Sequence, residues 1–74
     1  MAKLPRVTAK QMIAVLEELG FSYKRQTGSH AIYRNAAGVR ATVPIHSGAI
    51  LHPKIIKTIL NDTGITSDKL RSFL

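Results

Sequence analysis

The spacing of apolar residues changes twice along this chain, and each change restricts the folds that it can adopt. Residues 8–19 place apolar side chains at the three- and four-residue intervals of an amphipathic helix, at Met12, Val15, Leu16 and Leu19. From Phe21 to Val43 apolar and polar residues alternate, which predicts strands, and a helical pattern returns after Pro53. The order helix, strands, helix predicts an α+β fold.

The first helix has clear signals at both ends. Thr8 and Gln11 have the spacing of a capping box, and Gly20 follows the helix at a position where a positive φ is common. Before this helix, Pro5 disfavours helical structure, so residues 1–7 are expected to form a short basic arm.

The C-terminal part predicts one longer and one short helix. Pro53 suits the first turn of the longer helix, whose apolar stripe is formed by Ile55, Ile56, Ile59 and Leu60. Gly64 is expected to end this helix. Thr66 or Ser67 can then cap a short last helix with one apolar edge, formed by Leu70, Phe73 and Leu74.

The alternating region predicts a three-stranded antiparallel sheet, with strands at 21–26, 29–35 and 39–43 and turns at 27–28 and 35–38. In the first strand, one face is expected to carry Phe21, Tyr23 and Arg25. In the second strand, one face carries Ala31 and Tyr33 and the other carries His30, Ile32 and Arg34. Either of these faces can pack inward. Both long helices can cover one side of the sheet and leave the other side open for a ligand.

Size and composition exclude several classes of protein. Seventy-four residues form a single domain, 1–74, and the absence of cysteine excludes disulfides and thiolate metal sites. The apolar runs are too short to cross a bilayer, and the N-terminus lacks the apolar region of a signal peptide, so a cytoplasmic protein is expected. Glycine motifs for phosphate or dinucleotide binding are absent.

The charge of the chain is strongly positive and unevenly distributed. The formal net charge is +7, and the segment from Leu19 to Asn61 contains no acidic residue. A positive field of this kind attracts a polyanion such as a nucleic acid. A solvated basic surface that maintains solubility is the alternative interpretation.

His30 is the candidate catalytic residue. Metal-dependent nucleases hold divalent ions with carboxylates, which the central segment lacks, so metal-free chemistry is expected there. A histidine can deprotonate the 2′-hydroxyl of RNA, which then attacks the adjacent phosphodiester, while nearby cations stabilise the transition state. The alternative is a strand histidine that makes an ordinary surface hydrogen bond.

The other histidines and the tyrosines have open assignments. His46 can supply a general acid, a phosphate contact or a loop hydrogen bond, and His52 is expected to be structural at the start of the second long helix. A metal site formed by all three histidines has no matching ligand spacing. Tyr23 and Tyr33 can stack on bases or pack in the core or at the sheet edge.

Four short motifs, in this order and at these intervals, resemble the HicA toxins of bacterial and archaeal toxin–antitoxin systems. They are Gly20-Phe21, Gly28-Ser29-His30, Val43-Pro44-Ile45-His46, and Ile59-Leu60 through Gly64-Ile65. The similarity covers nearly the whole chain from Thr8. This chain has Pro53-Lys54 where the family typically has Gly-Thr.

The resemblance implies a double-stranded-RNA-binding-like fold and the activity of an mRNA interferase, an endoribonuclease that cleaves mRNA without the ribosome or a cofactor. His30 corresponds to the essential histidine of the family, and a HicB-type antitoxin is the implied partner that holds the toxin inactive. Around this histidine, the candidate RNA contacts are Lys24, Arg25, Ser29, Arg34, Arg40 and His46. A non-catalytic module that binds structured RNA is the main alternative function, and a partner-dependent interaction module is the next.

Overall fold

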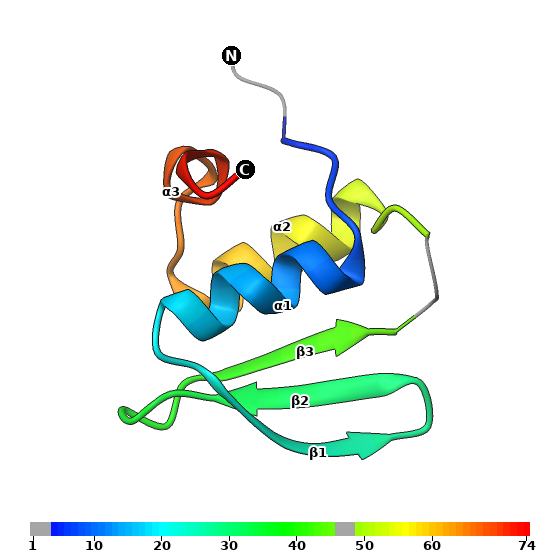
Figure 1. Ribbon diagram of the computed structural model, residues 1–74, viewed down its shortest axis with the longest axis vertical. Coiled ribbons are helices and arrows are strands. Elements are labelled where there is room, and N and C mark those ends of the chain that lie inside the picture. Colours follow the sequence, from blue (N-terminus) through cyan, green and yellow to red (C-terminus); the bar gives the residue numbers. More distant parts are fainter. Residues whose placement is uncertain (1–3, 46–48) are drawn as a thin grey trace.

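The computed structural model describes residues 4–45 and 49–74, and this part of the chain forms three helices and three strands (Figure 1). The elements are α1 (Ala9–Glu18), β1 (Ser22–Thr27), β2 (His30–Arg34), β3 (Arg40–Pro44), α2 (Pro53–Thr63) and α3 (Ser67–Ser72). The predicted α+β order, with its short C-terminal helix, is confirmed. None of the described helices is long and apolar enough to span a membrane.

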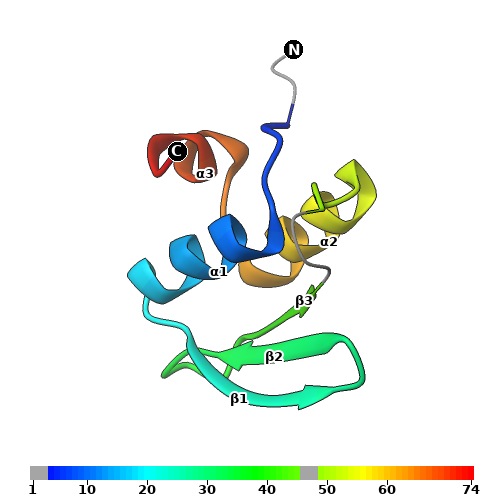
Figure 2. The ribbon, with the colours of Figure 1, turned by 45° about the vertical axis from the view of Figure 1, so that its right-hand side comes forward.

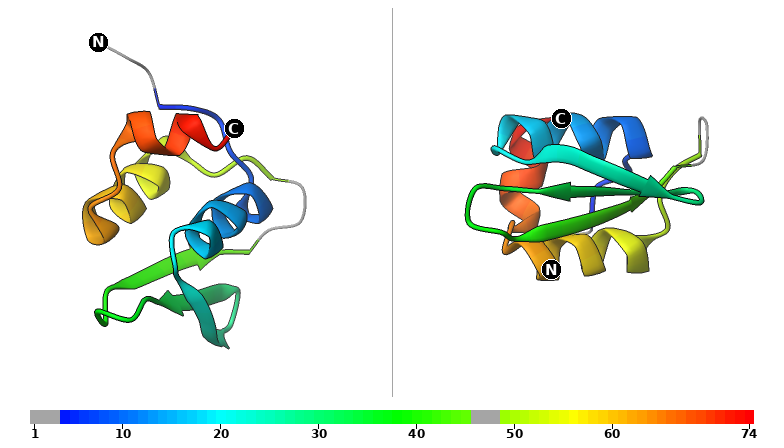
Figure 3. Two further views of the ribbon diagram at one scale, coloured as in Figure 1. Left: turned by 60° about the vertical axis from the view of Figure 1, so that its left-hand side comes forward. Right: turned by 90° about the horizontal axis from the view of Figure 1, so that it is seen from below.

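The three strands form one antiparallel sheet in the order β1, β2, β3. Helices α1 and α2 lie on one face of this sheet, and α3 lies on the far side of these two helices (Figures 1 and 2). In the described part of the chain, the other face of the sheet carries no helix (Figure 3). The predicted one-sided arrangement is therefore confirmed.

Burial determines which side of β2 faces the helices. Ala31 and Tyr33 belong to the hydrophobic core, together with Val43 and Ala41, their partners on β3. Ile32 points to the other side of the strand and does not belong to this core cluster, although only 8% of its surface is exposed. The sequence allowed either face of β2 to pack inward, and in the structure the helices cover the face that carries Ala31 and Tyr33.

Helix α1 begins and ends where the sequence predicts. The Gln11 N–H donates to Thr8 Oγ1 (3.2 Å), and the Thr8 N–H donates to Gln11 Oε1 (2.9 Å), which completes the capping box. At the other end, Gly20 has φ +92° and the Phe21 N–H donates to the Leu16 carbonyl (2.9 Å), the bond that defines a Schellman motif. Phe21 is buried in the core by this turn, and β1 starts one residue later than predicted.

Helix α2 also has the predicted ends. His52 is its N-cap, Pro53 is its first residue, and Gly64 follows it with φ +75°. The side of this helix that faces the core carries Ile56, Ile59 and Leu60, whereas Ile55 is only half-buried. Ile55 lines a groove between α2 and β3 instead.

Helix α3 is short and is anchored by one residue. Thr66 caps it, since its Oγ1 accepts the Lys69 N–H (3.1 Å). Leu70 is fully buried, but Phe73 is 38% exposed and Leu74 is 53% exposed. The predicted apolar edge is therefore buried at its first residue only.

The N-terminal segment is packed from Leu4 onward rather than forming a free arm. Val7 is fully buried, and its carbonyl accepts the Leu51 N–H (2.8 Å). Thr8 forms an isolated antiparallel bridge with Ile50. These contacts join the start of α1 to the segment that precedes α2.

Candidate nucleic-acid interface

His30 is the first residue of β2 and follows a two-residue turn formed by Gly28 and Ser29. Gly28 has φ +59°, a conformation that favours glycine at the first central position of a tight hairpin turn. The Gln26 side chain donates from Nε2 to the Gly28 carbonyl (3.0 Å), and the Ile45 N–H donates to the Ser29 carbonyl (2.6 Å). These bonds connect the turn to β1 and to the end of β3, so they give the exposed His30 a defined position.

A β-bulge in β1 changes which of its side chains face the helices. The register shifts between Tyr23 and Arg25, so that Tyr23 pairs with Tyr33, whereas Arg25 pairs with Ile32. Lys24 is the extra residue that such a bulge inserts. The prediction that Tyr23 and Arg25 share one side is therefore wrong, because the bulge moves Arg25 to the side of the sheet away from the helices.

The side of the sheet away from the helices, which we call the open face, carries His30. Its residues form three cross-strand rows: Ser22–Arg34–Arg40, Arg25–Ile32–Thr42 and Thr27–His30–Pro44. Ile32 lies in the middle row between Arg25 and Thr42, and the methylene groups of Arg25 can cover an apolar side chain of this kind. One surface thus combines a histidine, three arginines and a central apolar residue.

Three of the predicted RNA contacts lie on the open face, Arg25, Arg34 and Arg40. Arg34 also donates from Nη1 to the Gly38 carbonyl (3.0 Å), so part of its guanidinium supports the turn between β2 and β3. Lys24 is exposed at the bulge, and Ser29 is exposed in the turn before β2. The sixth predicted contact, His46, lies outside the described residues.

The sheet and the helices differ in their content of acidic residues. All four acidic residues lie in helices, at Glu17 and Glu18 of α1, Asp62 of α2 and Asp68 of α3. The sheet consequently contains no carboxylate to repel a phosphate. Within residues 4–45 and 49–74, no three histidine, aspartate or glutamate side chains are grouped to hold a metal ion. Of the cations in the acid-free middle of the sequence, Arg25, Arg34 and Arg40 thus share one surface of the fold.

A groove of about 330 Å³ lies beside His30, where the open face meets α2. Its walls are formed by His30, Thr42, Pro44, Ile55, Thr58 and Ile59. Helix α2 runs alongside β3 when the sheet is seen from below (Figure 3, right). Sequence reasoning missed this groove because no spacing along the chain links the end of β3 to α2. In the sequence Ile55 belongs to the predicted apolar stripe, and only the structure shows that the core leaves it half-buried.

His52 has the structural role that the sequence predicts. Its Nδ1 accepts a hydrogen bond from the Lys54 N–H (3.0 Å), which caps α2. A histidine that accepts through Nδ1 carries its ring proton on Nε2. His52 is therefore a helix cap and does not line the groove beside His30.

The two tyrosines lie on the helix side of the sheet. Tyr33 is 6% exposed and Tyr23 is 54% exposed, and their ring centroids are 5.7 Å apart in an edge-to-face arrangement. Burial raises the pKa of the Tyr33 hydroxyl above its ordinary value of 10.0, and the charges of Glu17 and Tyr23 raise it further. Tyr33 is thus a core residue and Tyr23 an edge residue, so neither is placed to stack on a base at the open face.

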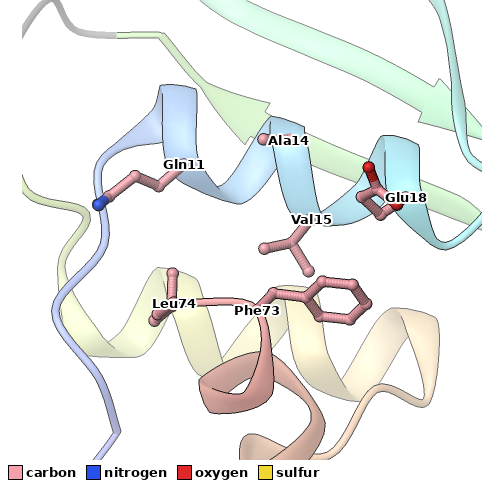
Figure 4. A pocket seen from close by; sticks show the side chains of 6 residues that line it. All are labelled: Gln11, Ala14, Val15, Glu18, Phe73 and Leu74. Atoms are coloured by element: carbon pink, nitrogen blue, oxygen red, sulfur yellow. The ribbon is translucent and has the colours of Figure 1, made fainter.

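A second groove, of about 470 Å³, lies in the helical layers between α1 and α3 (Figure 4). Phe73 and Leu74 lie across it from Ala14 and Val15, and Glu18 stands at its rim. A carboxylate at the rim repels phosphate, and none of the described lining residues is basic. This groove therefore does not extend the cationic surface.

The fold and the open face define a basic α+β domain of the double-stranded-RNA-binding type. Residues 9–65, well over half of the chain, match the family model for the HicA toxin of bacterial toxin–antitoxin systems. The chain therefore belongs to the HicA toxin family, as its motifs predicted. The comparison with curated proteins gave no match. The matched region contains the whole sheet and α2, whereas α3 follows it.

Proposed function

We propose that this protein is a metal-independent endoribonuclease that cleaves mRNA in the cytoplasm. The observation that carries the proposal is the position of His30, which is exposed on the same face as three arginines and lines a groove. Cleavage of RNA without a metal requires a general base near a surface that stabilises phosphate charge. The open face supplies both.

In the proposed reaction, His30 takes the proton from a ribose 2′-hydroxyl. The 2′-oxygen attacks the adjacent phosphorus, and the bond from phosphorus to the 5′-oxygen of the next nucleotide breaks. The products are a 2′,3′-cyclic phosphate and a 5′-hydroxyl, after a general acid or water has protonated the leaving oxygen. Arg25 and Arg40 stabilise the negative charge that develops on the phosphate oxygens.

The test compares wild type with His30→Ala on an mRNA in the presence of EDTA. We expect the variant to lose about 10²- to 10⁴-fold in rate, the usual contribution of a general base. Because His30 is exposed, its removal should leave the melting temperature nearly unchanged. The wild-type products should carry 2′,3′-cyclic phosphate and 5′-hydroxyl ends.

His52→Asn is the matched control, since asparagine is also a good N-cap and His52 does not line the groove. It should cleave at the wild-type rate. Undiminished cleavage by His30→Ala, or no cleavage by a folded wild type, would refute the proposal. Products with 5′-phosphate ends would indicate a water nucleophile instead of the 2′-hydroxyl.

A non-catalytic module that binds structured RNA is the second candidate function. The observation that favours it is the fold itself, because double-stranded-RNA-binding domains recognise the shape of a duplex without cleaving it. This candidate predicts retention of duplex RNA in a gel-shift assay, with no products and no effect of His30→Ala. A catalytic function predicts that wild type forms cleavage products and that His30→Ala largely abolishes them.

A HicB-type antitoxin is the proposed partner, and we place it on the open face over His30. A domain this small offers few other ways to block a polyanionic substrate, and an acidic partner surface would complement Arg25 and Arg40. Charge reversal at these two arginines should weaken the complex, as measured by calorimetry. A complex in which His30 stays exposed to solvent would contradict direct occlusion.

A further inference from the structure

The groove beside His30 differs in chemistry from the arginine-rich surface that adjoins it. Apart from His30, its walls consist of three apolar residues and two threonines, with no charged side chain among the described lining residues. A phosphate needs cations or several N–H donors, which these walls do not present. An aromatic base needs apolar surface for its faces and a few polar groups for its edge, which they do present.

The volume of the groove fits the same ligand. At about 330 Å³ it lies at the lower end of the range of roughly 300–1,000 Å³ that is typical of small-molecule sites. It can therefore hold one nucleotide and is too small for several stacked bases. A base in a duplex stays stacked and paired, so only a base from an unpaired segment can enter.

The hydrogen bond of the Thr58 hydroxyl determines which base edges the groove favours. Its hydroxyl donates to the Lys54 carbonyl one turn earlier in α2 (2.9 Å). The hydroxyl proton is therefore already used, and Thr58 Oγ1 presents acceptor lone pairs to a ligand. An acceptor at this wall favours a base edge that carries an exocyclic amino group over one that carries a carbonyl oxygen.

Helix α2 also brings positive charge to the rim of the groove. Lys54 precedes Thr58 by four residues, so the two side chains lie on the same side of the helix. Its exposed ammonium group can reach the phosphate of a nucleotide whose base occupies the groove. The strand of RNA would then run from the arginines of the open face to this lysine.

We infer that the groove between β3 and α2 is a subsite for one unstacked nucleobase next to the cleaved phosphate, and that Thr58 sets a preference for amino-bearing bases there. This inference rests on the proposed ribonuclease function. It means that the substrate is single-stranded RNA, although the fold resembles a duplex-binding domain. It also assigns α2 a role in choosing the cleavage position.

The first experiment maps the cleavage sites of wild type, Thr58→Val and Thr58→Ser on a long unstructured RNA. Valine keeps the shape of threonine and removes the acceptor, whereas serine keeps the acceptor. We expect Thr58→Val to lose a base preference of roughly two- to tenfold at one position beside the cut, the range for one hydrogen bond, because cleavage slows at the sites that carry an amino-bearing base there. Thr58→Ser should retain the preference.

Thr63→Val is the matched control. Thr63 makes the same kind of hydrogen bond, from Oγ1 to the Ile59 carbonyl (2.7 Å), but does not line the groove. Its cleavage pattern should equal that of wild type. A Thr58→Val pattern identical to that of wild type would overturn the inference while leaving the ribonuclease function intact.

A second experiment does not depend on cleavage. The methyl signals of Thr42, Thr58 and Ile59 are followed by NMR while a 2′-O-methyl tetranucleotide, which cannot be cleaved, is added to wild type. We expect these signals to shift with the single strand and to shift little with a duplex of the same sequence. Shifts at the groove support the subsite even if wild type cleaves no RNA, and their absence with a bound tetranucleotide overturns it.

Discussion

Replacing Gly28 by alanine tests how the turn before β2 positions His30. Gly28 has φ +59°, in the region that residues with a side chain rarely adopt. A Cβ added at this position meets no atom within 4 Å, so the substitution causes no steric clash. Its whole cost is the conformational cost of placing alanine at positive φ, about 1–2 kcal/mol.

This cost predicts measurable changes in stability and activity. For a domain of this size, 1 kcal/mol corresponds to about 4–8 °C, so the melting temperature should fall by roughly 4–16 °C. The variant should still be folded at 25 °C, because small domains have stabilities of about 5–15 kcal/mol. If alanine relieves the strain by changing the turn, His30 moves, and cleavage should fall by more than the small loss of folded protein explains.

Gly64→Ala separates the two effects. Gly64 has φ +75° and equally free surroundings, but it follows α2 and belongs to no turn of the sheet. It should lose a similar amount of stability in thermal unfolding followed by circular dichroism. Its cleavage rate per folded molecule should stay within about twofold of wild type. Equal losses of cleavage in both variants, or no change in the stability of Gly28→Ala, would refute the reasoning.

Three further predictions concern the open face, the first helix and the core. Arg25→Gln removes a phosphate contact, so the negative slope of log affinity against log salt for a 2′-O-methyl single strand should become smaller in magnitude by about 0.7. Lys10→Gln on α1 is the control and should leave this slope unchanged. Thr8→Ala removes the capping-box acceptor and should cost about 1 kcal/mol in urea unfolding, most of which Thr8→Ser should restore. Because the pKa of Tyr33 is raised in the folded state, the unfolded state loses this proton first as the pH rises above 10.0. Stability should therefore fall above pH 10.0, and Tyr33→Phe should flatten that fall; an equally steep fall in the variant would contradict this assignment.

The helix ends show how much of this fold is readable from short stretches of sequence. The Thr8 and Gln11 capping box, the glycine after α1 and the proline at the start of α2 all occur as predicted. Each depends on hydrogen bonds or φ angles within a few consecutive residues, so the local sequence contains the necessary information. The turn that precedes His30 belongs to the same class.

The side on which Arg25 lies is different, because it depends on pairing between strands. Strict alternation predicts that Arg25 shares a face with Tyr23, and the bulge at Lys24 reverses this. A bulge is an extra residue relative to the partner strand, so it becomes visible only once β2 is in place. The three arginines could be predicted as candidates, but their common face could not.

The groove beside His30 depends on packing over an even longer range. Local sequence is sufficient for the alternating strands, for the basic, acid-free centre and for His30 on a turn, because these are properties of neighbouring residues. The position of α2 against β3 brings Thr42 and Thr58 to the same cavity, and it follows from burying Ile59 and Val43 in one core. Which apolar side chains are buried together depends on all the apolar surfaces of the chain. The position of α2 is therefore determined only by the complete fold.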